Sequence, residues 1–250
     1  MTREIKLIEY ELIDSTNLQA RRYVSELDGK ASEPVLFLAH AQTAGRGRLG
    51  RSFYSPADTG LYFSLLTSFP EKLEKILSLT ALAAVAAAEQ IESTFGRRVD
   101  IKWVNDLYLD SRKVAGILAE SCVADTQRYI ILGIGINLST ESFPDDLTIK
   151  AGSLGATDVT KETKCTLAKK ICARLLDLLE SDDVSAAMQV YRERSCVIGK
   201  RIKFLQDGRE ISADAIDVTD LGALVLKLDS GETLELSTGE ISIFVQKEQI

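Results

Sequence analysis

Residues 99–136, VDIKWVNDLYLDSRKVAGILAESCVADTQRYIILGIGI, decide the fold class, because apolar stretches alternate there with short turn-forming breaks. Their β-branched and aromatic residues favour strands, and short connections join antiparallel neighbours. The sequence therefore predicts a largely antiparallel sheet built from four strands in this region: Val99–Trp103, Asp106–Leu109, Val114–Val123 and Tyr129–Ile136.

The chain before this region predicts further strands and two helices. An alanine-rich stretch at residues 71–95 has high helix propensity and few bulky side chains, so we expect it to pack closely on one face of the sheet. A second helix should start near Asn17, since the oxygens of Asp14, Ser15 and Thr16 are suited to cap it. Additional strands are expected at Lys6–Leu12, Val35–Ala41 and Gly60–Ser68.

The C-terminal part of the chain has a different pattern. Thr163–Leu179 and Val184–Glu193 predict two amphipathic helices. Short alternating stretches from Lys200 to Gln246, broken at glycines, are then typical of a small β-barrel. We expect an α+β fold with two domains, residues 1–197 and 198–250: a mixed, largely antiparallel sheet flanked by helices, followed by the barrel.

Composition excludes several classes of protein. The chain has 250 residues and a net charge of −7, which argues against broad nucleic-acid binding. Four cysteines without a CxxC pair and a single histidine, His40, argue against a zinc site and for a reducing compartment. No apolar run is long enough for a signal peptide or a membrane span, so we expect a cytoplasmic protein.

The strongest local signal is GRGRLGR at residues 45–51, which combines three glycines with three arginines. Glycines let backbone amides approach a ligand, and guanidinium groups bind phosphate or carboxylate oxygens in pairs. The stretch predicts a loop that binds a polyphosphate. A solvated basic loop or an RNA contact of the RGG type would give the same string.

Two later stretches add candidate ligand contacts. Lys113 enters an apolar strand close to Gly116, where its ammonium group can reach a ligand anion. In GIGIN at residues 133–137 the strand loses side chains at alternate positions, so a flat ligand ring could lie on its backbone. Close packing of the long helix would explain these glycines equally well.

Together and in this order, five motifs resemble those of the biotin protein ligase family: STN at 15–17, GRGRLGR at 45–51, KWVND at 102–106, KVAGIL at 113–118 and GIGIN at 133–137. The resemblance covers the catalytic region and extends to the C-terminal barrel, which is similar to the family's SH3-like domain. It implies a core related to class II synthetases, the form without an N-terminal DNA-binding domain, and ATP-dependent transfer of biotin to a lysine. The family's acceptor is a biotin carboxyl carrier protein; monomer and homodimer both remain open.

The resemblance also implies roles for individual residues. The biotin site would comprise Ser15, Thr16, Asn17, Gln42, Gly45, Arg46, Gly47, Arg48, Lys113, Gly116 and Gly133. The ATP site would comprise Arg48, Arg51, Phe53, Lys102, Asn105, Lys113 and Asn137, with Asn105 and Asp106 as candidate Mg²⁺ ligands. Lys113, Arg48 and Asp106 would be the catalytic residues.

Three positions depart from the family's pattern. Val104 replaces a usual proline, Leu49 replaces a frequent basic residue, and Phe53 replaces a common tryptophan. Phe53 still offers a ring face on which adenine can stack. Three rivals remain open: a lipoate or octanoate ligase or transferase with the same core, a regulator that senses biotinyl-AMP, and an RNA-binding protein. The GRGRLGR loop and the terminal barrel favour biotin.

Overall fold

The computed structural model describes residues 4–27, 33–69, 76–148, 150–157, 159–206 and 208–243. The first residues of the predicted long helix, 71–75, and the end of the predicted barrel, 244–246, lie outside this part of the chain.

The larger domain is built on a seven-stranded sheet of order β1-β2-β3-β7-β6-β5-β4. Strands β1 and β2 are parallel and all other neighbours are antiparallel, which confirms the mixed, largely antiparallel sheet. The strands are β1 (Lys6–Tyr10), β2 (Val35–Ala39), β3 (Gly60–Ser68), β4 (Asp100–Lys102), β5 (Asp106–Leu109), β6 (Arg112–Ala124) and β7 (Gln127–Asn137).

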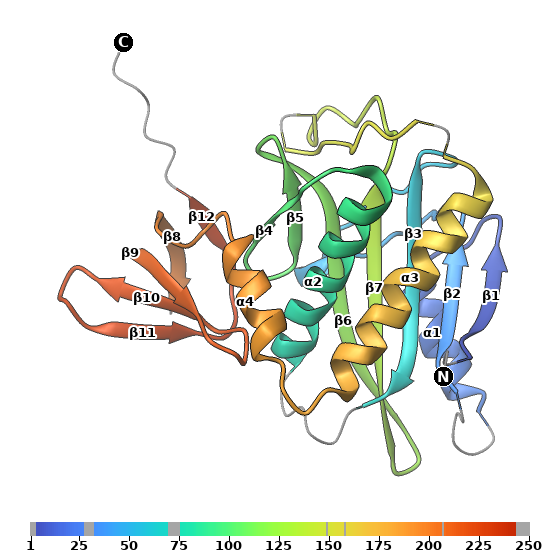
Figure 1. Ribbon diagram of the computed structural model, residues 1–250, viewed down its shortest axis with the longest axis horizontal. Coiled ribbons are helices and arrows are strands. Elements are labelled where there is room, and N and C mark those ends of the chain that lie inside the picture. The colour runs from blue at the N-terminus through green and yellow to red at the C-terminus, as the bar shows by residue number, and fades with distance from the viewer. Residues whose placement is uncertain are drawn as a thin grey trace.

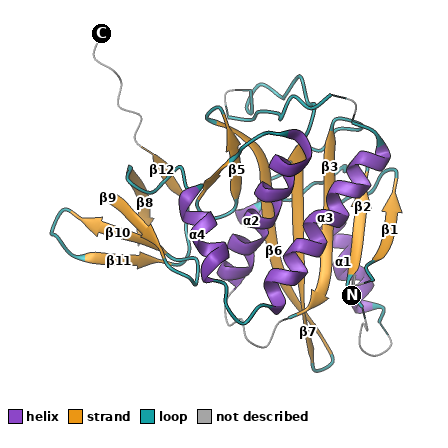
Figure 2. Ribbon diagram, in the orientation of Figure 1, coloured by secondary structure: helices purple, strands orange, loops and turns teal. Residues whose placement is uncertain are grey.

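Helices cover both faces of this sheet (Figures 1 and 2). The helices α2 (Ile76–Phe95) and α3 (Lys161–Glu180) lie side by side on one face, and α4 (Ser185–Glu193) packs beside α2. The predicted close packing of α2 is confirmed, because its alanines at positions 81, 83, 84, 86, 87 and 88 are fully buried. The helix α1 (Thr16–Ser25) lies on the opposite face against β3 and β7.

The side chains of β7 separate these two faces. Leu132, Ile134 and Ile136 belong to the main core with α2 and α3. Successive residues of a strand point to opposite faces, so Gly133 and Gly135 face the side on which α1 lies. Packing of the long helix therefore does not explain these glycines.

A second sheet follows the helices, with the order β11-β10-β9-β8-β12 and antiparallel pairing throughout. Its buried residues belong to the same core cluster as those of the larger domain. Trp103 Nε1 donates a hydrogen bond to Gly222 O at 2.9 Å, and Ser78 Oγ donates one to Leu221 O at 3.0 Å. The strands are β8 (Arg201–Gln206), β9 (Arg209–Val218), β10 (Leu224–Leu228), β11 (Thr233–Leu236) and β12 (Ile241–Ile243).

Among the residues that the structure describes, element boundaries differ from the predictions by at most two residues, and those of β3 and β5 agree fully. The two-residue differences are the early ends of β1 and β2 and the early starts of β6, β7 and α3. In the described part of the chain, no helix is long and apolar enough to span a membrane.

Candidate functional site

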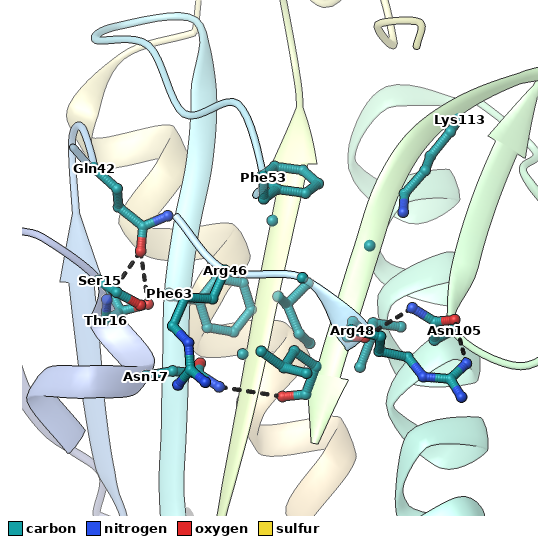
Figure 3. A pocket seen from close by; sticks show the side chains of 17 residues that line it. Ser15, Thr16, Asn17, Gln42, Arg46, Arg48, Phe53, Phe63, Asn105 and Lys113 are labelled. Carbon is teal, nitrogen blue, oxygen red and sulfur yellow. Dashed lines mark hydrogen bonds between the residues drawn. The ribbon is translucent and has the colours of Figure 1, made fainter. Parts of the chain in front are cut away.

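A pocket opens on the α1 side of the sheet, over β6 and β7 (Figure 3). The enclosed space, including the part open to solvent, is about 450 Å³, a usual size for a small-molecule site. Its lining comes from stretches that are far apart in the chain: Ser15, Thr16, Asn17, Gln42, Arg46, Gly47, Arg48, Phe53, Phe63, Asn105, Lys113, Gly116, Ile117, Leu118, Gly133, Ile134 and Gly135.

The STN triplet reaches the pocket from the first turn of α1. Asn17 lies directly on the strand backbone, because a side-chain carbon at Gly133 would be 2.0 Å from Asn17 Oδ1. The carboxamide is held by Ser64 Oγ, which donates to Oδ1 at 2.6 Å, and by Leu118 O, which accepts from Nδ2 at 3.4 Å. Nδ2 also donates to Glu120 Oε2 at 2.9 Å, so both ends of the carboxamide of Asn17, which is 4% exposed, are held.

Gln42 binds the start of α1 in a way that the sequence did not predict. Ser15 is the N-cap residue, but its side chain makes no capping hydrogen bond. The Thr16 amide instead donates to Gln42 Oε1 at 2.9 Å. Gln42 Nε2 donates to Ser55 Oγ at 2.9 Å, so both ends of the Gln42 side-chain amide are used. The capping prediction was therefore wrong in its choice of acceptor.

The basic loop folds over the pocket as a tight turn. Gly47 N donates to Arg51 O at 2.7 Å, and Arg51 N donates to Arg48 O at 3.1 Å. Leu49, at the tip, has φ 54° and is 72% exposed. The turn directs Arg48 toward Asn105, whose Oδ1 accepts from Arg48 Nη1 at 3.1 Å (Figure 3).

Two glycines of the sheet make room for an aromatic ring and a lysine. A side-chain carbon at Gly135 would lie 2.5 Å from the Phe53 ring, and one at Gly116 would lie 3.1 Å from Lys113 Nζ. The place directly above Gly135 is thus taken by Phe53, whose edge also packs against Tyr62 with ring centroids 6.4 Å apart. Burial raises the pKa of the Tyr62 phenol.

Lys113 and Asp106 form the closest ion pair at the pocket, with 2.6 Å between Nζ and Oδ1. The lysine is 32% exposed and the carboxylate 23% exposed. Both are partly withdrawn from water, so their charges are less screened than those of a surface pair.

The candidate metal ligands do not fit a metal held by the protein alone. Asn105 Oδ1 already accepts from Arg48, and Asp106 Oδ1 already faces Lys113. Both oxygens therefore lie beside cations. Among the described residues, no three His, Cys, Asp or Glu side chains are grouped as metal ligands.

Five predicted site residues lie outside the lining of the pocket, as far as the described residues define it. Arg51 Nη2 pairs with Glu240 Oε2 at 2.5 Å, and Asn137 Nδ2 donates to Gly152 O at 2.9 Å. Asp106 Oδ1 lies 2.6 Å from Lys113 Nζ, which does line the pocket. The other two are Lys102, whose Nζ lies 5.3 Å from the centroid of the Tyr108 ring, and Gly45, where a side-chain carbon would be 2.4 Å from Phe53 O.

Sequence reasoning missed several residues around the pocket. Phe63, Ile117, Leu118, Ile134 and Gly135 line it, and Ser64, Ser55 and Glu120 bind residues that line it. Ile117, Leu118, Ile134 and Gly135 stand inside the KVAGIL and GIGIN motifs but were not assigned to the site. The polar residues carry no motif, and only the pairing of strands brings them to the site.

Two family models match the chain. The model of the biotin/lipoate A/B protein ligase family matches residues 10–137, which include every lining residue of the pocket. The chain belongs to this family. The model of the biotin protein ligase C-terminal domain matches residues 197–243, the region of the second sheet.

Individual members of the biotin/lipoate A/B protein ligase family resemble the chain over different lengths. The bifunctional ligase/repressor BirA of Bacillus spizizenii is 40% identical over 151 residues, which are 59% of this chain and 46% of that protein. The chain thus spans less than half the length of this relative. The biotin–[acetyl-CoA-carboxylase] ligase of Mycobacterium tuberculosis is 30% identical over 226 residues, 87% of this chain and 80% of that protein.

A solved structure agrees with the fold over almost the whole chain. The biotin protein ligase from Aquifex aeolicus in complex with biotin and ATP has a TM-score of 0.78 and 27% identity. The alignment covers 96% of this chain and 98% of that one, so it includes both sheets.

Proposed function

We propose that this protein is a biotin protein ligase, which activates biotin with ATP to biotinyl-5′-AMP and transfers the biotinyl group to a lysine of a carrier protein. The observation that carries the proposal is the match of residues 197–243 to the model of the biotin protein ligase C-terminal domain. The family model for the catalytic region is shared by biotin and lipoate enzymes, whereas the model that matches residues 197–243 is specific to biotin protein ligases.

The relatives support the same choice of substrates. The Mycobacterium protein is named for ligation of biotin to acetyl-CoA carboxylase, and the Aquifex enzyme was solved with biotin and ATP. We propose the biotin carboxyl carrier protein of such a carboxylase as the acceptor. A cytoplasmic location remains a prediction from the sequence.

We propose that the biotin ring binds among the polar residues at the start of α1. A ureido ring presents two N–H donors and one carbonyl acceptor, which match hydroxyl and amide side chains in a closed pocket. Asn17 and Thr16 supply such groups, and Phe63 supplies an apolar wall. The full proposed set is Ser15, Thr16, Asn17, Gln42, Gly45, Arg46, Gly47, Arg48, Lys113, Gly116 and Gly133.

The first half-reaction joins the biotin carboxylate to the α-phosphorus of ATP, and pyrophosphate leaves. A carboxylic acid of ordinary pKa, about 4 to 5, is ionised at neutral pH, so no general base is needed. Catalysis then consists of aligning two anions and screening their repulsion. Arg46, Arg48 and Lys113 all line the pocket and supply this positive charge, and the loop that carries the two arginines excludes water from the mixed anhydride.

We propose that ATP binds between the basic loop and the β5–β6 hairpin. Phe53 offers a ring face to adenine, and Arg48 and Asn105 are already joined at the pocket wall. Arg51 is placed to meet the pyrophosphate once it releases Glu240. Lys102 and Asn137 are assigned to the nucleotide by the resemblance alone, since each has another partner here.

Mg²⁺ that entered with ATP would offset part of the negative charge of the phosphates. Because Asn105 Oδ1 and Asp106 Oδ1 both face cations, we derive no step through the metal from these two residues.

In the second half-reaction the amine of the acceptor lysine attacks the acyl carbonyl of the adenylate, the amide bond forms and AMP leaves. The amine must lose a proton first, because its unperturbed pKa is about 10.4. We propose that the charge of Lys113 favours the neutral amine as it approaches, and that Asp106 accepts the proton. The 2.6 Å ion pair places the two groups side by side at the edge of the pocket.

We propose residues 1–197 as the catalytic domain and 198–250 as the small C-terminal domain. The connection between β11 and β12 contributes to the site through Gly239 O, which accepts from Arg48 Nη2 at 3.4 Å.

Biotin-dependent exchange of labelled pyrophosphate into ATP tests the first half-reaction without a carrier. The proposal predicts exchange with biotin and none with lipoate at equal concentration. Exchange with lipoate alone would move the protein to the lipoate branch of the family, and exchange with neither acid would reject the adenylation chemistry.

A further inference from the structure

Glu120 lies beside the pocket on β6, although no motif includes it. Its side chain is 16% exposed. Oε2 accepts from Asn17 Nδ2 at 2.9 Å, and Oε1 accepts from Arg46 Nη1 at 3.1 Å. A second cation, Arg21 Nη2, lies 3.5 Å from Oε1. One carboxylate therefore joins α1, the basic loop and the sheet.

The contact with Glu120 decides which way the Asn17 carboxamide faces. An ionised carboxylate accepts hydrogen bonds but cannot donate them, so the NH₂ end of Asn17 must point at Glu120. Leu118 O is a second acceptor for the same NH₂ group at 3.4 Å. The Oδ1 end is left on the side of Ser64, where it accepts at 2.6 Å and keeps a second lone pair for the pocket.

The contact with Arg46 fixes the basic loop. Arg46 is 39% exposed and precedes the turn that carries Arg48, so its anchor limits where the loop can lie. Asn17 and Arg46 are drawn together beneath the loop in Figure 3, which agrees with their shared partner.

We infer that Glu120 is a positioning residue for the ligand. It presents Asn17 to the pocket as a hydrogen-bond acceptor for a ring N–H, and it holds the basic loop over the pocket through Arg46. This inference rests on the proposed biotin site, whose ureido ring carries the N–H groups. Glu120 itself does not touch the reacting atoms.

Two substitutions separate the contacts that Glu120 makes. Glu120→Ala removes the contacts with both Asn17 and Arg46. Glu120→Gln removes the charge that pairs with Arg46 and leaves an amide oxygen that still accepts from Asn17, but its own NH₂ group lets the Asn17 amide reverse. Glu89→Gln is a matched control, because Glu89 also pairs with an arginine, Arg174, at 2.7 Å and is 24% exposed, on the helical layer of the opposite face.

Calorimetric titration of the 250-residue protein with biotin, without ATP, measures the expected effect. Loss of a hydrogen bond to a charged group predicts about tenfold weaker binding for Glu120→Ala and a smaller loss, about threefold, for Glu120→Gln. In the exchange assay the KM for biotin should rise by similar factors while kcat changes less than about twofold. Glu89→Gln should bind biotin like the wild type.

A second measurement covers the case in which Glu120→Ala does not fold. Trypsin cleaves after arginine, so the cleavage rate within residues 45–51 reports how firmly the loop is held. Glu120→Gln should be cleaved there faster than the wild type or Glu89→Gln.

Unchanged biotin affinity in both Glu120 variants, or unchanged loop cleavage in a folded Glu120→Gln, would overturn the inference. An equal loss in Glu89→Gln would also overturn it, because the effect would then be general destabilisation. Failure of the wild type to bind biotin would reject the proposed function instead.

Discussion

The Asn17 carboxamide rests on the main chain of Gly133, so closely that a side-chain carbon there would lie 2.0 Å from Oδ1. Gly133 of the GIGIN motif thus leaves the space that Asn17 of the STN motif occupies. This contact explains why β7, with its two glycines, and the start of α1 belong to one binding site although they lie more than a hundred residues apart in sequence.

Replacing Gly133 with alanine should weaken biotin binding about 100-fold, because Asn17 must move by the order of an ångström to clear the new methyl group. Calorimetry with biotin measures the loss. Ile131→Val is the control on the same face of β7, beneath α1; it should cost about 1 kcal/mol of stability and leave biotin affinity unchanged. Wild-type affinity in Gly133→Ala would contradict this account of the pocket.

Replacing Asp106 with asparagine should slow transfer to the carrier lysine by about tenfold to a hundredfold and leave adenylate formation intact. The reason is that the substitution removes a proton acceptor next to Lys113 but no group that screens the phosphate. Single-turnover transfer from preformed adenylate isolates the step. Asp100→Asn, at the exposed start of β4, is the control. Normal transfer by Asp106→Asn would remove Asp106 from the mechanism.

The substitution Glu240→Gln should lower the KM for ATP by up to about fivefold. The Arg51–Glu240 pair is exposed, with 68% and 42% of the two side chains accessible, so it contributes no more than about 1 kcal/mol. Releasing Arg51 removes a competitor of the pyrophosphate. Pyrophosphate exchange at varied ATP measures the change, with Glu210→Gln on the same sheet as the control. An unchanged or higher KM would contradict the competition.

Asp14 gives the start of α1 a dependence on acid. Its hydrogen bond from Arg22 Nη1, at 3.0 Å, holds the pKa of the Asp14 carboxyl below its usual range. Because the pKa of Asp14 is lower in the folded protein than in the unfolded chain, its ionisation stabilises the fold at pH values above the unfolded-state pKa of about 4. This stabilisation is lost as the pH falls through the pKa of Asp14 in the folded protein.

Denaturant unfolding between pH 7 and pH 2 tests this dependence. Asp14→Asn should be less stable than the wild type at pH 7, by at most about 1 kcal/mol for a pair this exposed. The difference should shrink below pH 4, and a difference that stays constant across this range would contradict the assignment.

The sequence predicted the strands of the sheet well because each has its own local signal of β-branched residues between turns. It also selected Asn17, Arg46, Lys113 and Gly133, since these stand inside motifs of unusual composition. Boundaries were predicted less well, because the ends of strands depend on neighbours: β7 pairs with β3 over residues 129–137 and with β6 over residues 127–136.

What the sequence could not predict depends on contacts between distant segments. Glu120 is one polar residue in a long strand, and only the approach of α1 and the basic loop gives it partners. The capping acceptor of α1 is Gln42, 26 residues away from Thr16. The contact of Arg48 with Gly239 joins residues that are 191 positions apart.

Intact mass spectrometry of an apo biotin carrier domain, incubated with this protein, ATP, Mg²⁺ and biotin, tests the central claim most directly. A parallel reaction contains lipoate in place of biotin. The account predicts a mass gain of one biotinyl group on the carrier and none with lipoate. A gain only with lipoate, or no gain in either reaction while free adenylate accumulates, would contradict it.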